Sequence, residues 1–336
     1  MLSEIDGDNP PLAAIFGIAG TTLTAEEREF FQTVNPLGFI LFARNFTDPA
    51  QARALTDSLR ACIGREVPIL IDQEGGRVQR LKPPHWKQYP PAGEFGTSFM
   101  ADFAKGRAAL DESMSSLATE LADAGINVNC APVLDVRFPE THPAIGDRAF
   151  GNAPEAVAAL GAAVCETFLA AGVVPVVKHM PGLGRADLDT HKDLPAVTAS
   201  LEDLEIVDFR PFRDMQTRAF SEAVWGMISH AIYNAVDERA PASCSRKVIR
   251  DIIRGAMGFD GLLLSDDLSM DALAQYGGVP ERAEMVLRGG CDIALHCNGK
   301  LDEMQAMAAR IGKMTNDAVI RYNRSASWVR RNFSNG

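Results

Sequence analysis

The stretch VVPVVKHMPGLGRADLDTHKDLP, residues 173–195, begins like a buried β-strand and ends like a charged loop. Its first five residues are apolar or proline, as in a strand that is covered on both faces. Lys178 and His179 follow at the strand end. A segment with Pro181 and two glycines then leads to a group of charged residues: Asp187, Asp189, His191, Lys192 and Asp193. The same pattern, a buried strand that ends in ionisable side chains, recurs along the chain.

Eight apolar runs of this kind occur: 13–20, 38–42, 67–72, 126–136, 173–179, 224–230, 261–267 and 291–297. Segments with helical spacing that are rich in Ala, Leu, Glu and Arg separate most of them, for example 49–64 and 152–172. Eight strands that alternate with helices predict an α/β fold, and the number favours a single-domain (β/α)8 barrel of the TIM type. A doubly wound parallel sheet is the alternative.

Two of the connections between these runs are long. Residues 73–105 contain one Gly-Gly and two Pro-Pro pairs, so we expect them to be mostly loop. Residues 180–199 form the second long connection. Ser200 is then expected to cap the next helix, which Pro211 should interrupt. The last segment, from about 301 to 333, is expected to be helical.

Composition limits the classes of function. The chain has 336 residues, of which 46% are hydrophobic and 23% charged, as in ordinary globular proteins. A net charge of −11 is unsuited to nucleic acid or to an anionic membrane surface. The first residues are acidic and lack the apolar stretch of a signal peptide, so we expect no such leader. No apolar run approaches the roughly 18 residues of a membrane span. Six scattered cysteines without a CxxC pair are expected to be reduced thiols of a cytoplasmic protein.

Polar residues gather at the carboxyl ends of the predicted strands: Asp72, Asn129 with Asp135, Lys178 with His179, Ser229 with His230, Asp266 with Asp267, and His296 with Asn298. In a parallel barrel these ends meet at one face, where barrel enzymes build their active sites. The sequence therefore predicts a pocket that holds several carboxylates, several imidazoles and a lysine.

Some of these residues have simpler interpretations. We interpret Asp267 as a cap for the helix that follows, and His230 and His296 as hydrogen-bonded histidines at the rim. Lys178 could form an imine with a carbonyl substrate or bind substrate oxygens as a cation. The second role is favoured, because nothing around Lys178 in the sequence predicts a lowered pKa.

Metal and nucleotide sites are poorly supported. His179 and His191 are twelve residues apart across a loop, which is a weak metal-binding pattern. Gly182 and Gly184 match no phosphate-binding motif. We expect no metal and no organic cofactor. Asp266 on a strand and the Asp189-x-His191 pair on a loop remain, and they suit hydrolysis of a glycosidic bond, which needs a nucleophile and a proton donor. Asp189 could orient the imidazole for the second role.

Four segments carry a family resemblance: IDQEGGRVQRL (71–81), PAIGDRAFG (143–151), KHMPGLGRADLDTH (178–191) and LLLSDDLSM (262–270). They resemble the family 3 glycoside hydrolases and, within that family, the single-domain bacterial β-N-acetylhexosaminidases of peptidoglycan recycling. The similarity covers nearly the whole chain. It implies that residues 1–336 form one catalytic barrel with terminal helices from about 301.

The resemblance also implies a role for each matching residue. Asp266 is the expected nucleophile, His191 the acid/base and Asp189 its partner. Five residues are expected to bind the sugar: Asp72, Arg80, Arg148, Lys178 and His179. The implied activity is a retaining exo-β-N-acetylglucosaminidase, which removes terminal N-acetylglucosamine from muropeptides ending in 1,6-anhydro-N-acetylmuramic acid through a covalent glycosyl-enzyme.

The sequence departs from the family pattern at two positions. The usual KHFPGHG is KHMPGLG here, with Met180 for Phe and Leu183 for His. Neither position supplies the chemistry, so we expect a change only in the packing or mobility of the loop. Two other hypotheses are an imine-forming lyase that uses Lys178 and a sugar-binding barrel without catalysis. We expect a monomer that binds small carbohydrates, with no nucleic acid or membrane partner.

Overall fold

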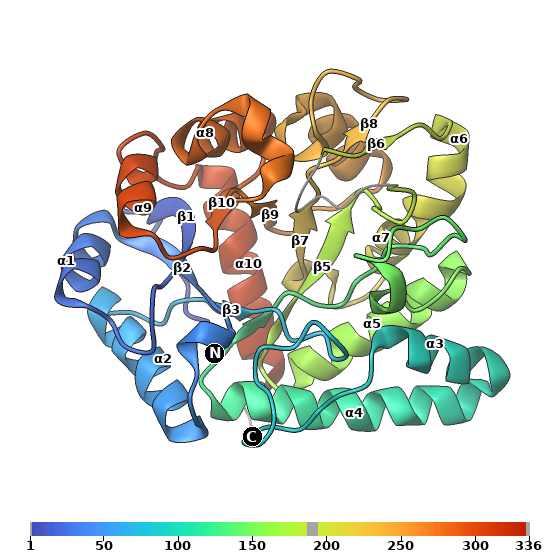
Figure 1. The fold of residues 1–336 in the computed structure, drawn as a ribbon, viewed down its shortest axis with the longest axis horizontal. Helices are drawn as coiled ribbons and strands as arrows, with labels where there is room; N and C mark the ends of the chain where they lie inside the picture. Colours follow the sequence, from blue (N-terminus) through green and yellow to red (C-terminus); the bar gives the residue numbers. More distant parts are fainter. Residues whose placement is uncertain (1, 187–193, 334–336) are drawn as a thin grey trace.

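Eight parallel strands close into a barrel in the computed structural model, which describes residues 2–186 and 194–333 (Figure 1). Strand β10 pairs with β1 and thereby completes the ring. The strands, in order around the barrel, are β1 (Leu12–Gly17), β2 (Pro36–Leu41), β3 (Ile69–Ile71), β4 (Val128–Asn129), β5 (Val174–Met180), β7 (Trp225–Ile228), β9 (Leu263–Asp267) and β10 (Ile293–His296). Each overlaps one predicted run, so the barrel prediction is confirmed and the doubly wound alternative is wrong.

Continuous burial explains why the strands are apolar runs and do not alternate with polar residues. Every residue of β1, β2 and β5 is buried. In a parallel barrel one face of each strand meets the interior and the other meets the surrounding helices, so both faces need apolar side chains. The polar side chains of Lys178 and His179 occur only where β5 ends.

Helices lie around the barrel (Figure 1). The principal ones are α1 (Ala25–Val34), α2 (Pro49–Ile63), α4 (Phe103–Asp123), α5 (Pro154–Ala170), α8 (Val279–Gly289), α9 (Leu301–Ala308) and α10 (Asn316–Phe333). Local signals start several of them. Thr24 and Glu27 form a capping box at α1, and Asp48 accepts a hydrogen bond from the Gln51 N–H at α2. The predicted terminal helices correspond to α9 and α10.

The prediction for residues 73–105 is wrong in its second half. Residues 92–101 form α3 (Ala92–Ala101), and α4 begins at Phe103. Pro91 stands at the N-cap of α3, so the Pro-Pro pair precedes a helix and does not extend the loop. Asp102 ends α3 and caps α4 through the Lys105 N–H, which lets one helix follow the other directly.

The region after residue 194 is only partly as predicted. Ser200 caps α6 (Leu201–Asp203) by accepting from the Asp203 N–H, as expected. Pro211 lies in the first turn of α7 (Arg210–Met215), where proline is tolerated, and so does not interrupt a helix. A small parallel sheet of β6 (Ala196–Val197) and β8 (Ile232–Tyr233) was not predicted, because two-residue strands leave no periodic signal.

Membrane-spanning helices and disulfides were considered from the sequence, and the structure bears on both. In the described residues, no helix is long and apolar enough to cross a membrane. All six cysteines lie in the described part of the chain and none of them forms a disulfide. Cys130, Cys165 and Cys291 are buried, in agreement with their apolar sequence settings.

Candidate active site

A pocket of about 520 Å³ opens where the strands end. Six of the eight predicted site residues line it: Asp72, Arg80, Arg148, Lys178, His179 and Asp266. The other two, Asp189 and His191, lie outside the described residues. The convergence that the polar strand ends predicted is therefore observed for every predicted site residue that the structure describes.

The barrel brings these residues together from separate parts of the chain. Asp72 directly follows β3, and Lys178 and His179 end β5. Arg148 ends a short 3-10 helix, η2 (Gly146–Arg148), in the connection after β4. Asp266 stands on β9. Because all strands run in the same direction, their carboxyl ends share one face, and residues nearly 200 positions apart line a single pocket.

Asp72 is held between two cations. Its Oδ2 accepts a hydrogen bond from Arg80 Nη2 at 3.1 Å, and its Oδ1 accepts one from Lys178 Nζ at 3.0 Å. Burial acts to raise the pKa of Asp72, but Lys178 and Arg80 outweigh it and keep the pKa well below its usual range. Asp72 is therefore a carboxylate at neutral pH and presents acceptor oxygens to the pocket.

Lys178 is a stable ammonium. Burial acts to lower the pKa of Lys178, but the carboxylates of Asp72 and Glu74 outweigh it and raise the pKa above its ordinary value. An imine-forming lysine needs the opposite shift, because only the neutral amine is a nucleophile. The geometry thus favours Lys178 as a hydrogen-bond donor.

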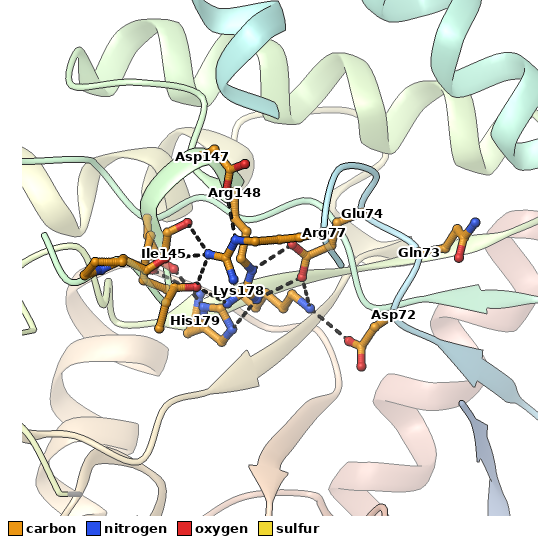
Figure 2. A network of polar contacts seen from close by, with 12 residues as sticks. Asp72, Gln73, Glu74, Arg77, Ile145, Asp147, Arg148, Lys178 and His179 are labelled. Carbon is orange, nitrogen blue, oxygen red and sulfur yellow. Dashed lines mark hydrogen bonds and ion pairs between the residues drawn. The ribbon is translucent and has the colours of Figure 1, made fainter. Parts of the chain in front are cut away.

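Glu74 belongs to this group and was not predicted. It forms an ion pair with Lys178 Nζ at 2.6 Å and two hydrogen bonds with Arg148, from Nε and Nη2, each at 2.8 Å (Figure 2). Despite burial, Arg148 and Lys178 lower the pKa of Glu74 to about 2. The position of Glu74 in the charged segment just after β3 could have indicated that it belongs to the site. The sequence does not show which cations it contacts.

His179 is oriented by Asp135, a strand-end residue to which the sequence assigned no role. The imidazole Nδ1 lies 2.7 Å from Asp135 Oδ2 and donates to it, because a carboxylate can only accept. Asp135 Oδ1 also accepts from the backbone N–H groups of His179 and Leu183, at 3.2 and 2.7 Å. On the other side of the ring, Nε2 lies 3.4 Å from Arg148 Nη2. The ring is thus held at both nitrogens.

The turn that carries Arg148 is attached to the loop after β3. Arg77 donates from Nε to Asp147 Oδ1 at 3.0 Å (Figure 2). Its Nη2 donates to the carbonyl oxygens of Pro143 and Ala144. Arg77 also lines the pocket, and its side chain is 45% exposed. Arg77 lies in segment 71–81, which carries part of the family resemblance. Its position relative to the neighbouring residues did not distinguish it from an ordinary solvent-exposed arginine.

Asp266 and Asp267 both line the pocket, although strict alternation along a strand would turn them to opposite faces. The register between β9 and β10 shifts here, with Ile293 opposite Leu264 and Leu295 opposite Asp267. Such an irregularity interrupts the alternation of side chains. Asp266 Oδ1 accepts a hydrogen bond from the Asp267 N–H at 2.8 Å, which orients this carboxylate.

Asp267 has a structural role, but it is not a helix cap. Its Oδ1 accepts from the N–H groups of Ser269 and Cys297, and its Oδ2 accepts from the Ser269 hydroxyl at 2.5 Å. The next helix begins only at Asp271, with Met270 at its N-cap. Asp267 therefore ties the turn after β9 to the end of β10.

The two rim histidines differ. His230 is buried and fully bonded: Nε2 donates to the Asp267 carbonyl oxygen at 3.1 Å, and Nδ1 lies 2.7 Å from the Ser243 hydroxyl. Burial lowers the pKa of His230. His296 contacts Glu303 through Nε2 at 3.1 Å, but its buried Nδ1 has no hydrogen-bond partner among the described residues. The interpretation as a hydrogen-bonded histidine is confirmed for His230 and only half correct for His296.

The two departures from the family pattern occupy different environments. Met180 is fully buried at the end of β5, beside Gly226. Leu183 lines the pocket, so this wall is apolar where the family pattern has a histidine. No group of three or more His, Cys, Asp or Glu side chains suited to a metal ion occurs within residues 2–186 and 194–333.

Comparison with known proteins points to one family. The sequence matches the family described as Glycosyl hydrolase family 3 N terminal domain over residues 14–324. A β-hexosaminidase of Stenotrophomonas maltophilia is 36% identical over 306 residues, which are 91% of this chain and 89% of that protein. A β-hexosaminidase of Nitrosomonas eutropha is 40% identical over 283 residues, 84% of this chain and 79% of the other.

Solved structures show the same likeness. NagZ from Neisseria gonorrhoeae, in complex with N-trifluoroacetyl-D-glucosamine, has a TM-score of 0.86 and 34% sequence identity, covering 94% of this chain and 90% of that one. A family 3 β-N-acetylglucosaminidase from Paenibacillus has a TM-score of 0.81 and 30% identity, covering 94% of this chain and 60% of the longer one.

Proposed function

This chain belongs to glycosyl hydrolase family 3 and is a β-N-acetylhexosaminidase, and we propose that it removes terminal β-linked N-acetylglucosamine with retention of configuration. One observation carries the proposal. Asp266 lines the same pocket as several cationic and carboxylate side chains, which ion pairs keep in place and which can hydrogen-bond to sugar hydroxyls. Retention in this chemistry needs a carboxylate nucleophile and an acid/base that acts twice.

Asp266 is the proposed nucleophile. Its carboxylate attacks the anomeric carbon and forms a covalent glycosyl-enzyme. The hydrogen bond from the Asp267 N–H to Oδ1 supports this role, because it restrains the carboxylate. Asp267 is a poor candidate for the same task, since both of its oxygens already accept hydrogen bonds from the neighbouring turn.

His191 is the proposed acid/base and Asp189 its partner, on the strength of the resemblance, since both lie outside the described residues. The imidazole donates a proton to the leaving oxygen in the first step and takes one from water in the second. Asp189 would hold the ring in the required tautomer and stabilise the charged form.

The proposed sugar-binding residues are Asp72, Arg80, Arg148, Lys178 and His179. Asp72 offers acceptors to hydroxyl groups, and Lys178 and Arg148 offer charged donors. Hydrogen bonds from charged groups contribute roughly 1.5–3 kcal/mol each. The ion pairs of Asp72 with Arg80 and Lys178 keep these charges in place before substrate arrives, and so does the ion pair of Arg148 with Glu74. This reduces the cost of ordering the side chains on binding.

The natural substrate is proposed to be a muropeptide ending in 1,6-anhydro-N-acetylmuramic acid, in cytoplasmic peptidoglycan recycling. Its support is the similarity to the recycling enzymes in four segments. We propose that residues 1–336 act as one catalytic barrel and as a monomer. A pocket of about 520 Å³ is within the usual range for small ligands. An imine-forming lyase is disfavoured by the charged state of Lys178, and no observation specifically favours a sugar-binding barrel without catalysis.

The test is hydrolysis of p-nitrophenyl N-acetyl-β-D-glucosaminide beside the corresponding β-glucoside, followed by the disaccharide N-acetylglucosaminyl-1,6-anhydro-N-acetylmuramic acid. We expect cleavage of the first and third compounds and little cleavage of the glucoside. Proton NMR of the early product should show the β-anomer. An α-anomer as first product would exclude a retaining mechanism, and a folded enzyme that cleaves neither N-acetyl substrate would refute the proposed function.

A further inference from the structure

One oxygen of Glu74 lies between two cations. Oε1 is 2.6 Å from Lys178 Nζ and 2.8 Å from Arg148 Nη2, while Oε2 is 2.8 Å from Arg148 Nε. Figure 2 shows the carboxylate between the two side chains. Lys178 and Arg148 both line the pocket, but Glu74 does not, and its side chain is only 7% exposed. Glu74 therefore contacts the proposed sugar-binding cations from behind.

Glu74 is the carboxylate that both cations contact. Lys178 has a second counterion in Asp72, whereas Arg148 otherwise bonds the carbonyl oxygen of Ala144 and approaches His179. Buried like charges repel, and the repulsion is strong where water is excluded. Without a negative charge at Glu74, Lys178 and Arg148 would move apart or draw solvent between them.

Among the described residues, none that lines the space behind Glu74 carries another carboxylate that could take its place. A small cavity of about 20 Å³ separates it from the helices. Apart from Glu74 and Arg148 the walls of this cavity are apolar, and they include Phe95, Leu110 and Val164. A single water could enter such a space but would find few partners there. Arg148 therefore relies on the Glu74 carboxylate for its position, and Lys178 relies on Glu74 together with Asp72.

We propose that Glu74 is a positioning residue for sugar binding, holding the Lys178 ammonium and the Arg148 guanidinium around one shared oxygen so that both present donors to the sugar. This inference rests on the proposed function, since it concerns the same pocket. Glu74 itself does not touch substrate. It acts through both cations in the ground state and in the transition state, so its loss should affect KM more than kcat.

Asp292 provides a matched control. Its side chain is 4% exposed, and it accepts hydrogen bonds from Arg254 Nη2 and Arg321 Nη1, each at 2.8 Å. It is therefore also a buried carboxylate between two cations. However, it precedes β10, at the amino end of the strand, and does not line the pocket. Asp292→Asn reports the cost of losing a buried charge far from the sugar.

The experiment compares Glu74→Gln, Glu74→Asp and Asp292→Asn with the wild type on p-nitrophenyl N-acetyl-β-D-glucosaminide. Loss of one charged hydrogen bond corresponds to about a 10- to 100-fold weaker complex. We expect Glu74→Gln to raise KM by about that factor with a much smaller change in kcat. Asp292→Asn should lower the Tm without changing KM. A KM unchanged in Glu74→Gln, or raised equally in Asp292→Asn, would overturn the proposal.

A pH profile separates positioning from simple stabilisation. The charged and titratable groups around Lys178 are Asp72, Glu74, Arg148 and Cys130. Removing one of the two carboxylates should lower the pKa of Lys178, so the pH above which the Kd for N-acetyl-D-glucosamine rises should be lower in Glu74→Gln than in the wild type. Glu74→Asp keeps the charge but shortens the reach, so it should raise the Kd without lowering that pH. A Kd of Glu74→Gln that rises at no lower pH than the wild-type Kd would contradict the proposed role.

Binding of N-acetyl-D-glucosamine, measured by calorimetry, keeps the two proposals distinguishable. If the wild type binds the sugar but hydrolyses nothing, the proposed function fails while the Kd of Glu74→Gln still decides the role of Glu74. An equal Kd in wild type and Glu74→Gln would refute the positioning role. If Glu74→Gln does not fold, the comparison is made with Glu74→Asp, for which a wild-type Kd would have the same meaning.

Discussion

The imidazole Nδ1 of His179 donates a hydrogen bond to Oδ2 of Asp135 at 2.7 Å, although the two residues are 44 positions apart. The other carboxylate oxygen accepts from two backbone N–H groups, those of His179 and Leu183. Asp135 is fully buried and does not line the pocket. It therefore fixes both the ring and the start of the loop that follows β5.

Replacement of Asp135 should impair sugar binding through His179. In Asp135→Asn the amide can still accept from the backbone but turns an N–H or a weaker acceptor toward Nδ1, so the ring loses its orientation. We expect KM for the aryl substrate to rise by about tenfold, the effect of one weakened hydrogen bond. Glu303→Gln, which alters the carboxylate beside His296 outside the pocket, is the matched control. Similar KM values for the two variants would argue against a role of His179 in binding.

Asp266→Asn and Asp267→Asn should affect different properties, the first the catalytic rate and the second the stability. Loss of the nucleophile acts on the transition state, so Asp266→Asn should lose nearly all kcat while keeping affinity for N-acetyl-D-glucosamine. Asp267→Asn weakens the bonds to Ser269 and Cys297 and should lower the free energy of unfolding by about 1–3 kcal/mol. Chemical denaturation and steady-state kinetics measure the two effects. Near-normal kcat in Asp266→Asn would remove this residue from the mechanism.

His191→Ala should slow both chemical steps unequally. An aryl leaving group needs little protonation, so glycosylation should survive better with p-nitrophenyl substrate than with the natural disaccharide. The second step still needs a base, so a glycosyl-enzyme on Asp266 should accumulate and be detectable by mass spectrometry. Azide needs no deprotonation and should restore turnover with a β-glycosyl azide as product. Equal slowing of both substrates, without azide rescue, would assign the acid/base role elsewhere.

Asp208 should make stability depend on pH in an unusual direction. Burial raises its pKa to about 6, although Arg185 Nε lies 2.7 Å from Oδ2, and the nearby Asp135 adds to the increase. The folded protein therefore binds this proton more tightly than the unfolded chain, for which the ordinary value is 3.8. Its contribution to stability is fully present below about pH 4 and is lost as the pH rises through 6.

Asp208→Asn tests this sign directly, because the amide does not titrate. The unfolding free energy of the wild type relative to Asp208→Asn should fall between pH 4 and 7, by as much as about 3 kcal/mol for a shift of this size. Asp251→Asn, at an exposed carboxylate, is the control and should show no such trend. A difference between wild type and Asp208→Asn that increases with pH would mean that Arg185 outweighs burial.

Local sequence patterns were sufficient for the strands and for the face that carries the pocket. An apolar run of five to eleven residues indicates burial on both faces, and a polar residue at its end indicates where the strand leaves the barrel. Both signals are local, so they can be recognised without knowing which residues each strand contacts. The family resemblance added the proposed roles of Asp266, Asp189 and His191, also from short segments of the sequence.

The tertiary structure alone decided which charges meet. Glu74 contacts Arg148 across 74 positions, and Asp72 contacts Lys178 across 106, because β4 pairs in parallel with both β3 and β5. The pocket-facing position of Asp267 depends on a shift of register between β9 and β10. The alternation of residues along β9 alone does not reveal such a shift. Sequence composition determines whether a side chain can ionise or be buried, but its partner and its pKa depend on distances that exist only after the chain has folded.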